Sequence, residues 1–227
     1  MAVIDDIKAK TRKQAVSGIE EKVAISLKES WSLIRLAAKK KGKELPKDPT
    51  EKITGATPEE TERLRAEEWL RLSRELIDDG PEGRKMKVNG VTLSLAELDE
   101  SLTEDMKKSL RITSFAQLVP KRKQVELIAD TMSESVAKNS GTGIGFLDNL
   151  FGGASLGDVF MGLFSWIFSG FKGGFGGLKE TIANRTGDRL KAGVVNDLTA
   201  LQNKLKGTDM DISAFMGPDA IRQVGEE

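Results

Sequence analysis

The side chains that most often carry enzyme chemistry are missing from this chain. Its 227 residues include no Cys, no His and no Tyr. Without Cys there is no thiolate nucleophile or zinc–thiolate site, and without His the commonest general base and metal ligand are absent. A Ser-His-Asp triad is excluded, whereas Ser–Lys pairs, carboxylate pairs and carboxylate-bound Mg²⁺ or Ca²⁺ remain. We expect a protein that is not an enzyme, with no catalytic residues and no cofactor.

Four carboxylates lie close together in the sequence and have the chemistry of a cation site: Asp99, Glu100, Glu104 and Asp105. A calcium loop of the EF-hand type needs carboxylates at fixed positions of an irregular loop. That spacing is absent here, and the surrounding sequence predicts a helix. The pattern therefore favours a solvated acidic face over a cation site, and we expect no metal.

The most unusual stretch of the chain is residues 141–178, called the Gly/Phe segment below. It holds 12 of the 23 glycines and 7 of the 9 phenylalanines, with only three charged residues. Its first glycines (GTGIG) lack the preceding strand and the lysine of a phosphate loop, so nucleotide binding is not indicated. Large apolar surfaces of this kind mark contacts with membranes or with other proteins.

The phenylalanines of this segment have helical order. On a helix from 159 to 178, five of them fall within roughly 80° of one another, with Leu and Ile beside them. Trp166 lies on the other side, where its ring suits the headgroup region of a bilayer. The predicted membrane-contact residues are Phe160, Phe164, Trp166, Ile167, Phe168, Phe171 and Phe175.

The length of this apolar stripe disfavours a simple transmembrane helix. Val159–Phe171 is 13 uncharged residues, or about 20 Å of helix against a hydrocarbon core of roughly 30 Å. Extending it meets Asp158 on one side and Lys172 on the other. Three alternatives remain: an element that lies on or inserts into a membrane, a hairpin buried in the protein's own core or in a subunit interface, and a full span.

Lysines supply the predicted contacts with lipid headgroups. The residues are Lys39, Lys40, Lys41, Lys43 and Lys172. Four of them follow an amphipathic helix, which fits an anionic membrane surface. The alternative is a solvated helix end, because cations also suit the C-terminal end of a helix dipole. With 35 basic and 35 acidic residues the net charge is zero, so nucleic acid is not an expected partner.

Periodicity and turn signals predict a mainly α protein, with several amphipathic helices and one small β-hairpin near 85–93. The hairpin signal is Asn89-Gly90. Charged helices fill 1–140, with a linker near 45–57, and a C-terminal helix and mobile tail fill 179–227 after the Gly/Phe segment. Gly187 and Gly193 weaken that last helix by about 1 kcal/mol each relative to Ala.

Capping residues mark where several predicted helices begin. Thr57 followed by Pro58 begins one helix, and Ser94 with Glu97 begins another that continues through Met106. Ser17 with Glu20 also matches a capping box, so a break near Ala15–Gly18 is predicted within the first helix, 1–41. Glu67 and Arg71 are spaced for an ion pair on the second helix.

These observations predict a non-enzymatic, membrane-interacting protein. Its Gly/Phe segment would insert into or lie on a bilayer, in association, remodelling or perforation, as part of a delivery machine and with self-association or protein partners. The alternative is a structural or assembly protein of a virion or secretion complex, with the segment buried against neighbouring subunits. The N-terminus (MAVIDDIKAK) is not a secretory signal peptide, so we expect cytoplasmic synthesis, followed by residence at a membrane or within a particle.

Overall fold

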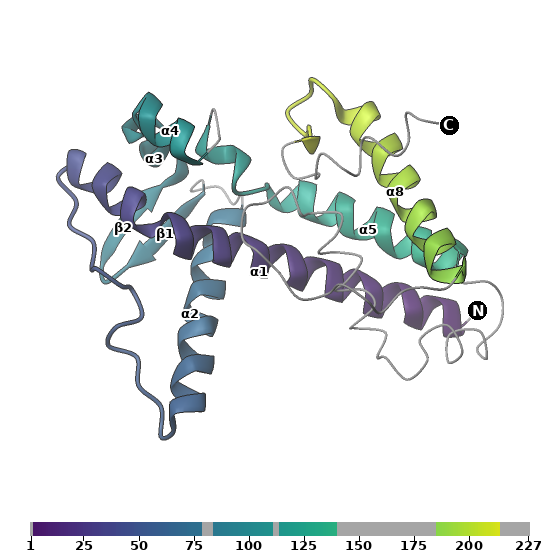
Figure 1. Cartoon of the computed structure of the whole chain (residues 1–227), viewed down its shortest axis with the longest axis horizontal. Coiled ribbons are helices and arrows are strands. Elements are labelled where there is room, and N and C mark those ends of the chain that lie inside the picture. Colours follow the sequence, from purple (N-terminus) through teal and green to yellow (C-terminus); the bar gives the residue numbers. More distant parts are fainter. Residues whose placement is uncertain (1, 79–83, 111–113, 140–184, 214–227) are drawn as a thin grey trace. The chain divides into compact units, whose positions relative to one another are not determined.

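A computed structural model describes residues 2–78, 84–110, 114–139 and 185–213 of the chain (Figure 1). The described chain is mainly helical with one two-stranded hairpin, which confirms the predicted fold class. The elements are α1 (Ala2–Lys40), α2 (Pro58–Ile77), β1 (Lys85–Val88), β2 (Val91–Ser94), α3 (Leu95–Ser101), α4 (Glu104–Leu110), the 3₁₀ turn η1 (Phe115–Gln117), α5 (Arg122–Asn139) and α8 (Arg185–Leu205). The Gly/Phe segment lies outside the described residues.

The chain divides into two compact units. Unit 1 comprises Met1–Ile19 and Lys123–Glu227, and unit 2 comprises Glu20–Arg122. Helix α1 is continuous and contributes to both units.

The break predicted near Ala15–Gly18 is wrong, because α1 runs through these residues without interruption. A capping box needs the Glu20 carboxylate to bond back to the backbone at Ser17. Glu20 instead accepts hydrogen bonds from Arg74 Nε at 2.7 Å and from Arg122 at 3.2 Å. The capping signal is present in the sequence, but the carboxylate binds two distant arginines and does not form the cap.

The core of unit 2 forms around the second half of α1 and around α2. Trp31 and Trp69 are both buried, and their rings meet edge to face with centroids 5.3 Å apart. The indole Nε1–H of Trp31 donates to the carbonyl of Pro46 at 3.1 Å, so the buried ring keeps its polar atom paired. The other buried apolar side chains of these two helices in unit 2 include Leu27 and Ile34 on α1 and Leu72, Leu76 and Ile77 on α2.

Helix α2 begins as the sequence predicts. The Thr57 hydroxyl accepts from the amide of Glu60 at 3.1 Å, and Pro58 occupies the first turn, where no amide donor is needed. On its exposed face Arg63 pairs with Glu67 at 3.5 Å, and Arg71 pairs with Glu68 at 2.7 Å. The predicted Glu67–Arg71 pair does not form, because both partners have nearer alternatives on the same face.

The predicted hairpin is confirmed. β1 and β2 pair antiparallel with Val88 opposite Val91, and Asn89 and Gly90 both have positive φ in the turn between them. Ser94 then forms the complete capping box with Glu97 that begins α3. The single helix predicted through Met106 is wrong, because Leu102 is extended and the Thr103 hydroxyl accepts from the Met106 amide at 3.3 Å, which starts α4 separately.

Arg84 closes unit 2 by bonding to carbonyls from two segments. Its Nε donates to Leu76 at 2.8 Å, a carbonyl at the end of α2, and its terminal nitrogen donates to Val119 and to Pro120. Carbonyls in the last turn of a helix have no partner within that helix. This one side chain therefore satisfies the end of α2 and fixes the chain ahead of α5.

Unit 1 is built from the first half of α1 together with α5 and α8. Arg12 on α1 pairs with Asp130 on α5, with Nε 2.5 Å from the carboxylate. The interior is only partly apolar, because Thr11, Ser133 and Gln202 are buried among valines, isoleucines and alanines. Within the part of the chain that the structure describes, the Thr11 hydroxyl and the side-chain amide oxygens of Gln14 and Gln202 have no hydrogen-bond partner. Such atoms reduce stability relative to an apolar core.

Candidate functional site

The predicted lysine run at the end of α1 is largely engaged by α3 of the same unit. Lys43 Nζ lies 2.7 Å from Glu97 and donates to the carbonyl of Thr92 at 2.8 Å. Lys41 Nζ lies 2.9 Å from Glu100, and Lys40 donates to a backbone carbonyl at Ser101 at 3.4 Å. Three of the four lysines thus hold the end of α1 against α3.

The Lys43–Glu97 contact has a clear electrostatic signature. The Lys43 ammonium, together with the backbone amide of Ser94, lowers the pKa of Glu97 to about 2 from an ordinary 4.5. Both donors stabilise the charged carboxylate. Glu97 therefore serves the capping box and the ion pair at the same time.

Two carboxylates of the acidic cluster have partners within the protein, although the sequence predicted a solvated acidic face. Asp99 accepts from the backbone amide of Phe115 at 2.6 Å and from the Ser114 hydroxyl at 3.1 Å, so it caps the turn η1. Glu100 pairs with Lys41, whereas Glu104 and Asp105 are exposed. The described residues contain no group of three acidic side chains placed to hold a metal ion.

The end of α1 is shaped by a left-handed glycine. Gly42 has φ of +71°, the amide of Lys43 donates to Ala38 at 3.0 Å, and the amide of Gly42 donates to Lys39 at 3.0 Å. These are the two hydrogen bonds of a Schellman motif. The chain then returns along the helix, where Leu45 accepts from Arg35 Nε at 3.4 Å.

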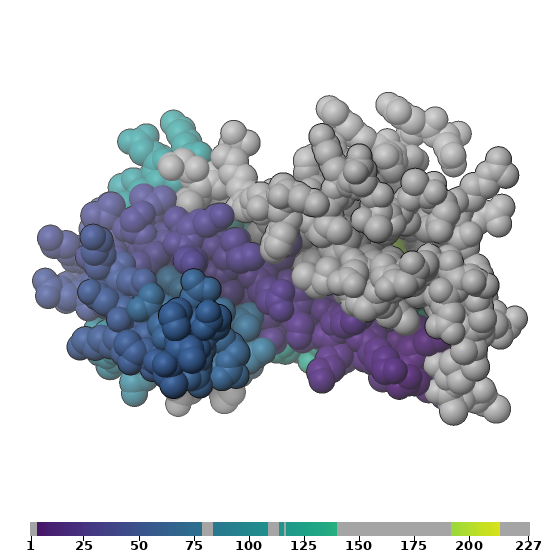
Figure 2. All heavy atoms as spheres, turned by 60° about the horizontal axis from the view of Figure 1, so that its bottom comes forward, coloured from purple at the N-terminus to yellow at the C-terminus, as the bar shows by residue number. Residues whose placement is uncertain are grey.

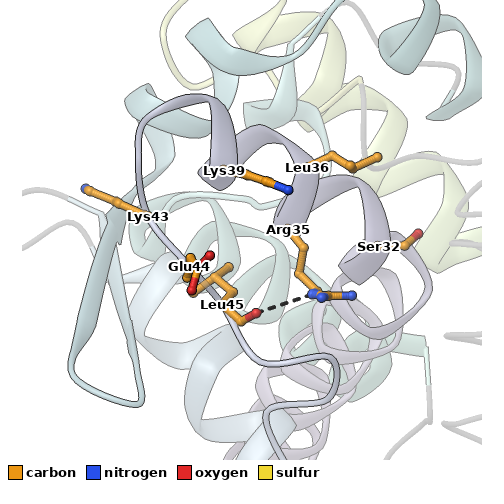
Figure 3. Close-up of a pocket in the computed structure, with 7 residues that line it drawn as sticks. All are labelled: Ser32, Arg35, Leu36, Lys39, Lys43, Glu44 and Leu45. Carbon is orange, nitrogen blue, oxygen red and sulfur yellow. Dashed lines mark hydrogen bonds between the residues drawn. The ribbon is translucent and has the colours of Figure 1, made fainter.

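This return encloses a hollow of about 320 Å³ between α1 and the returning chain (Figure 3). Its walls are Ser32, Arg35, Leu36, Lys39, Lys43, Glu44 and Leu45. Arg35 reaches toward the Leu45 carbonyl, whereas Lys43 extends away from the other lining side chains (Figure 3). We call this feature the basic hollow.

The basic hollow carries more positive than negative charge. Its lining holds three cations, Arg35, Lys39 and Lys43, and a single carboxylate, Glu44, and the Lys43 ammonium is already paired with Glu97. Leu36, on the same face of the helix, is 52% exposed and is one of two large apolar side chains exposed in the described part of the chain. A guanidinium and an ammonium that line the same hollow, with an exposed Leu on the same helix face, suit a ligand that has an anionic and an apolar part.

Sequence reasoning found Lys39 but missed Arg35 and Ser32. Their spacing held the signal, because positions 32, 35, 36 and 39 share one face of an α-helix. What the sequence alone could not show is the return of the chain after Gly42, which turns this face into a hollow.

Of the predicted membrane-contact residues, none lies within the described part of the chain. The same holds for Lys172 and for the GTGIG glycines. Within the described residues, no helix has the length and apolar character needed to cross a membrane.

The two helices that flank the Gly/Phe segment are described, and they are antiparallel neighbours. Near the start of α5, Gln124 Nε2 donates to the carbonyl of Asp211, which follows α8, at 2.8 Å. At the other end of α5, Gly193 of α8 lies so close to the Asn139 side chain that an added Cβ would collide with it. Glycine at position 193 therefore allows α8 to approach the end of α5 closely, whereas the weakening of α8 by this glycine stays a prediction. α5 thus ends, and α8 begins, at the same end of this helix pair (Figure 1).

The chain was compared with protein-family models, with curated protein sequences and with solved structures, and none of the three comparisons gives a match.

Proposed function

We propose that this protein associates with lipid membranes through its Gly/Phe segment and acts without catalysing a reaction. The observation that carries the proposal is the antiparallel α5–α8 pair, combined with the composition of the residues between these helices. Asn139 and Gly193 are in contact, so the chain leaves and rejoins the pair at one end. A segment attached in this way, rich in Phe and Gly, is suited to reach into a surface and return.

The attachment also bears on the mode of membrane contact. A single bilayer crossing would put the two ends of the segment on opposite faces of a core roughly 30 Å thick. That arrangement conflicts with the Asn139–Gly193 contact for as long as the helix pair stays together. The proposal is therefore an interfacial or re-entrant element, with the five-Phe stripe in the apolar region and Trp166 near the headgroups.

A flotation assay with phosphatidylcholine vesicles tests the proposal. The wild-type chain should float with the vesicles, and the Phe164→Asp/Phe168→Asp variant should not. Two fewer buried phenylalanines cost about 3–6 kcal/mol of partitioning. The matched control is Phe146→Asp/Phe151→Asp, which has the same substitutions within the segment but outside the stripe and should still float.

Tryptophan fluorescence gives a second measurement. Trp31 and Trp69 are buried in unit 2 and provide a constant background, so a lipid-dependent blue shift would report Trp166. A wild-type chain that remains below the vesicles would contradict the proposal. If that chain were also an oligomer which the Phe164→Asp/Phe168→Asp variant dissociates, the segment would instead be an assembly contact between subunits.

A further inference from the structure

The basic hollow is lined by hydrogen-bond donors that have no partner among the described residues. Arg35 donates through Nε to Leu45, and within the described residues its terminal nitrogens and the Lys39 ammonium have no hydrogen-bond or ion-pair partner. Ser32 adds a hydroxyl on the same wall. A guanidinium with free terminal N–H groups can bind phosphate through two parallel hydrogen bonds, and a nearby ammonium strengthens that contact.

The neighbouring lysines already have partners within unit 2, whereas among the described residues the terminal nitrogens of Arg35 and the Lys39 ammonium have none. Lys41 and Lys43 have carboxylate partners at 2.9 and 2.7 Å, and Lys40 bonds to a carbonyl. Among the described residues that line the hollow, Glu44 on the returning chain is the one carboxylate beside Arg35 and Lys39. The positive charge that remains for an external anion is therefore concentrated at Arg35 and Lys39.

Leu36 indicates which kind of phosphate the hollow receives. The Leu36 side chain is 52% exposed, and this residue lies between Arg35 and Lys39 in the sequence. Helix α1 lies at the surface in the view of Figure 2. A soluble phosphate would leave this leucine in water. A phospholipid would place its phosphate against the two cations and its glycerol and upper acyl region against the leucine.

We propose that the basic hollow binds the phosphate group of an anionic membrane lipid through Arg35, Lys39 and Ser32, with Leu36 against the lipid's apolar part. The lipid as source of the phosphate rests on the proposed membrane function, whereas phosphate binding itself does not. The hollow would give unit 2 a membrane contact that is separate from the Gly/Phe segment.

Vesicle binding with and without phosphatidic acid tests this proposal on the full chain. Phosphatidic acid should strengthen wild-type binding, and Arg35→Gln/Lys39→Gln should weaken binding to these vesicles about 20- to 30-fold, at about five-fold for each charge. The matched control is Lys40→Gln/Lys41→Gln, which removes the same charge from the same helix end and should retain most of the gain. Unchanged Trp31 and Trp69 fluorescence would show that both variants keep unit 2 folded.

An equal loss in the two double variants would overturn the proposal, because the lysines would then act only through overall charge or the helix dipole. NMR signals of the Arg35 Nε–H during titration with glycerol 3-phosphate separate this proposal from the membrane function. A shift in a chain that binds no vesicles would support phosphate binding and overturn the lipid source. No shift, with vesicle binding that depends on Phe164 and Phe168 alone, would overturn the hollow and leave the membrane function standing.

Discussion

Glu20 joins three segments of unit 2, and its replacement should have a large and specific effect. The carboxylate is 7% exposed and accepts from Arg74 at 2.7 Å and from Arg122 at 3.2 Å. Charge-assisted hydrogen bonds contribute about 1.5–3 kcal/mol each when buried. The Arg74 side chain is 54% exposed, so its bond is worth less than 1 kcal/mol after solvent screening. The Arg122 side chain is 28% exposed, so its hydrogen bond provides most of the stabilisation that the Glu20 carboxylate contributes.

We therefore expect Glu20→Gln to lower the free energy of unfolding of unit 2 by about 2 kcal/mol, since the amide oxygen can keep only one of the two bonds. The assay is urea unfolding followed by the fluorescence of Trp31 and Trp69, which both belong to unit 2. With an ordinary denaturant slope the midpoint should fall by about 1 M.

Glu21→Gln is the matched control, because it makes the same change one position along α1. Burial, and then the neighbouring charge of Glu20, raise the pKa of Glu21, so its charged form is disfavoured in the folded protein. Neutralising it should leave stability unchanged or slightly raised. Equal destabilisation by the two variants, or a change below about 0.5 kcal/mol for Glu20→Gln, would refute the reasoning, because surface substitutions alone produce effects of that size.

Two further predictions concern other contacts. The folded pKa of Glu97 is about 2 against an ordinary 4.5, so its stabilisation is present above pH 4.5 and is lost as the pH falls from 4.5 through 2. With the side chain 37% exposed, we expect a loss of about 1 kcal/mol over that window, measured by urea unfolding, and Glu97→Gln should remove this step. Gly193→Ala alone should change the stability of unit 1 by less than about 1 kcal/mol, because the gain in helix propensity is opposed by the Asn139 amide, which must leave Ser135 to admit the added Cβ. Combining it with Asn139→Ala should raise stability by about 1 kcal/mol, and calorimetry that shows no gain of the double variant over Gly193→Ala would contradict this packing.

Local sequence signals predicted the elements best where a few neighbouring residues determine the backbone conformation. Thr57 with Pro58, Asn89 with Gly90 and Ser94 with Glu97 each satisfy their own hydrogen bonds within a few positions, and all three appear in the structure as predicted. The Ser17–Glu20 signal failed because its carboxylate is shared with residues 54 and 102 positions away. A capping pattern says nothing about partners at that distance.

At the candidate site, too, the sequence placed the residues and the tertiary contacts determined their roles. The sequence placed four lysines at the end of α1, and each could have faced solvent. The pairing of Lys41 and Lys43 with α3, which leaves Arg35 and Lys39 without an ion-pair partner among the described residues, requires the hairpin and α3 to fold back on α1. No periodicity within a single helix contains that information.

By itself the sequence determined the fold class, the hairpin, most helix starts and the exclusion of His and Cys chemistry, because these depend on residue types and on short-range hydrogen bonds. The five-Phe stripe within the Gly/Phe segment also comes from the sequence alone. Only the tertiary structure decided which charges are used internally, that α1 is unbroken, and that α5 and α8 are antiparallel around Asn139 and Gly193. The reason is physical: these outcomes depend on which distant side chains reach one another, and that is fixed only when the units pack.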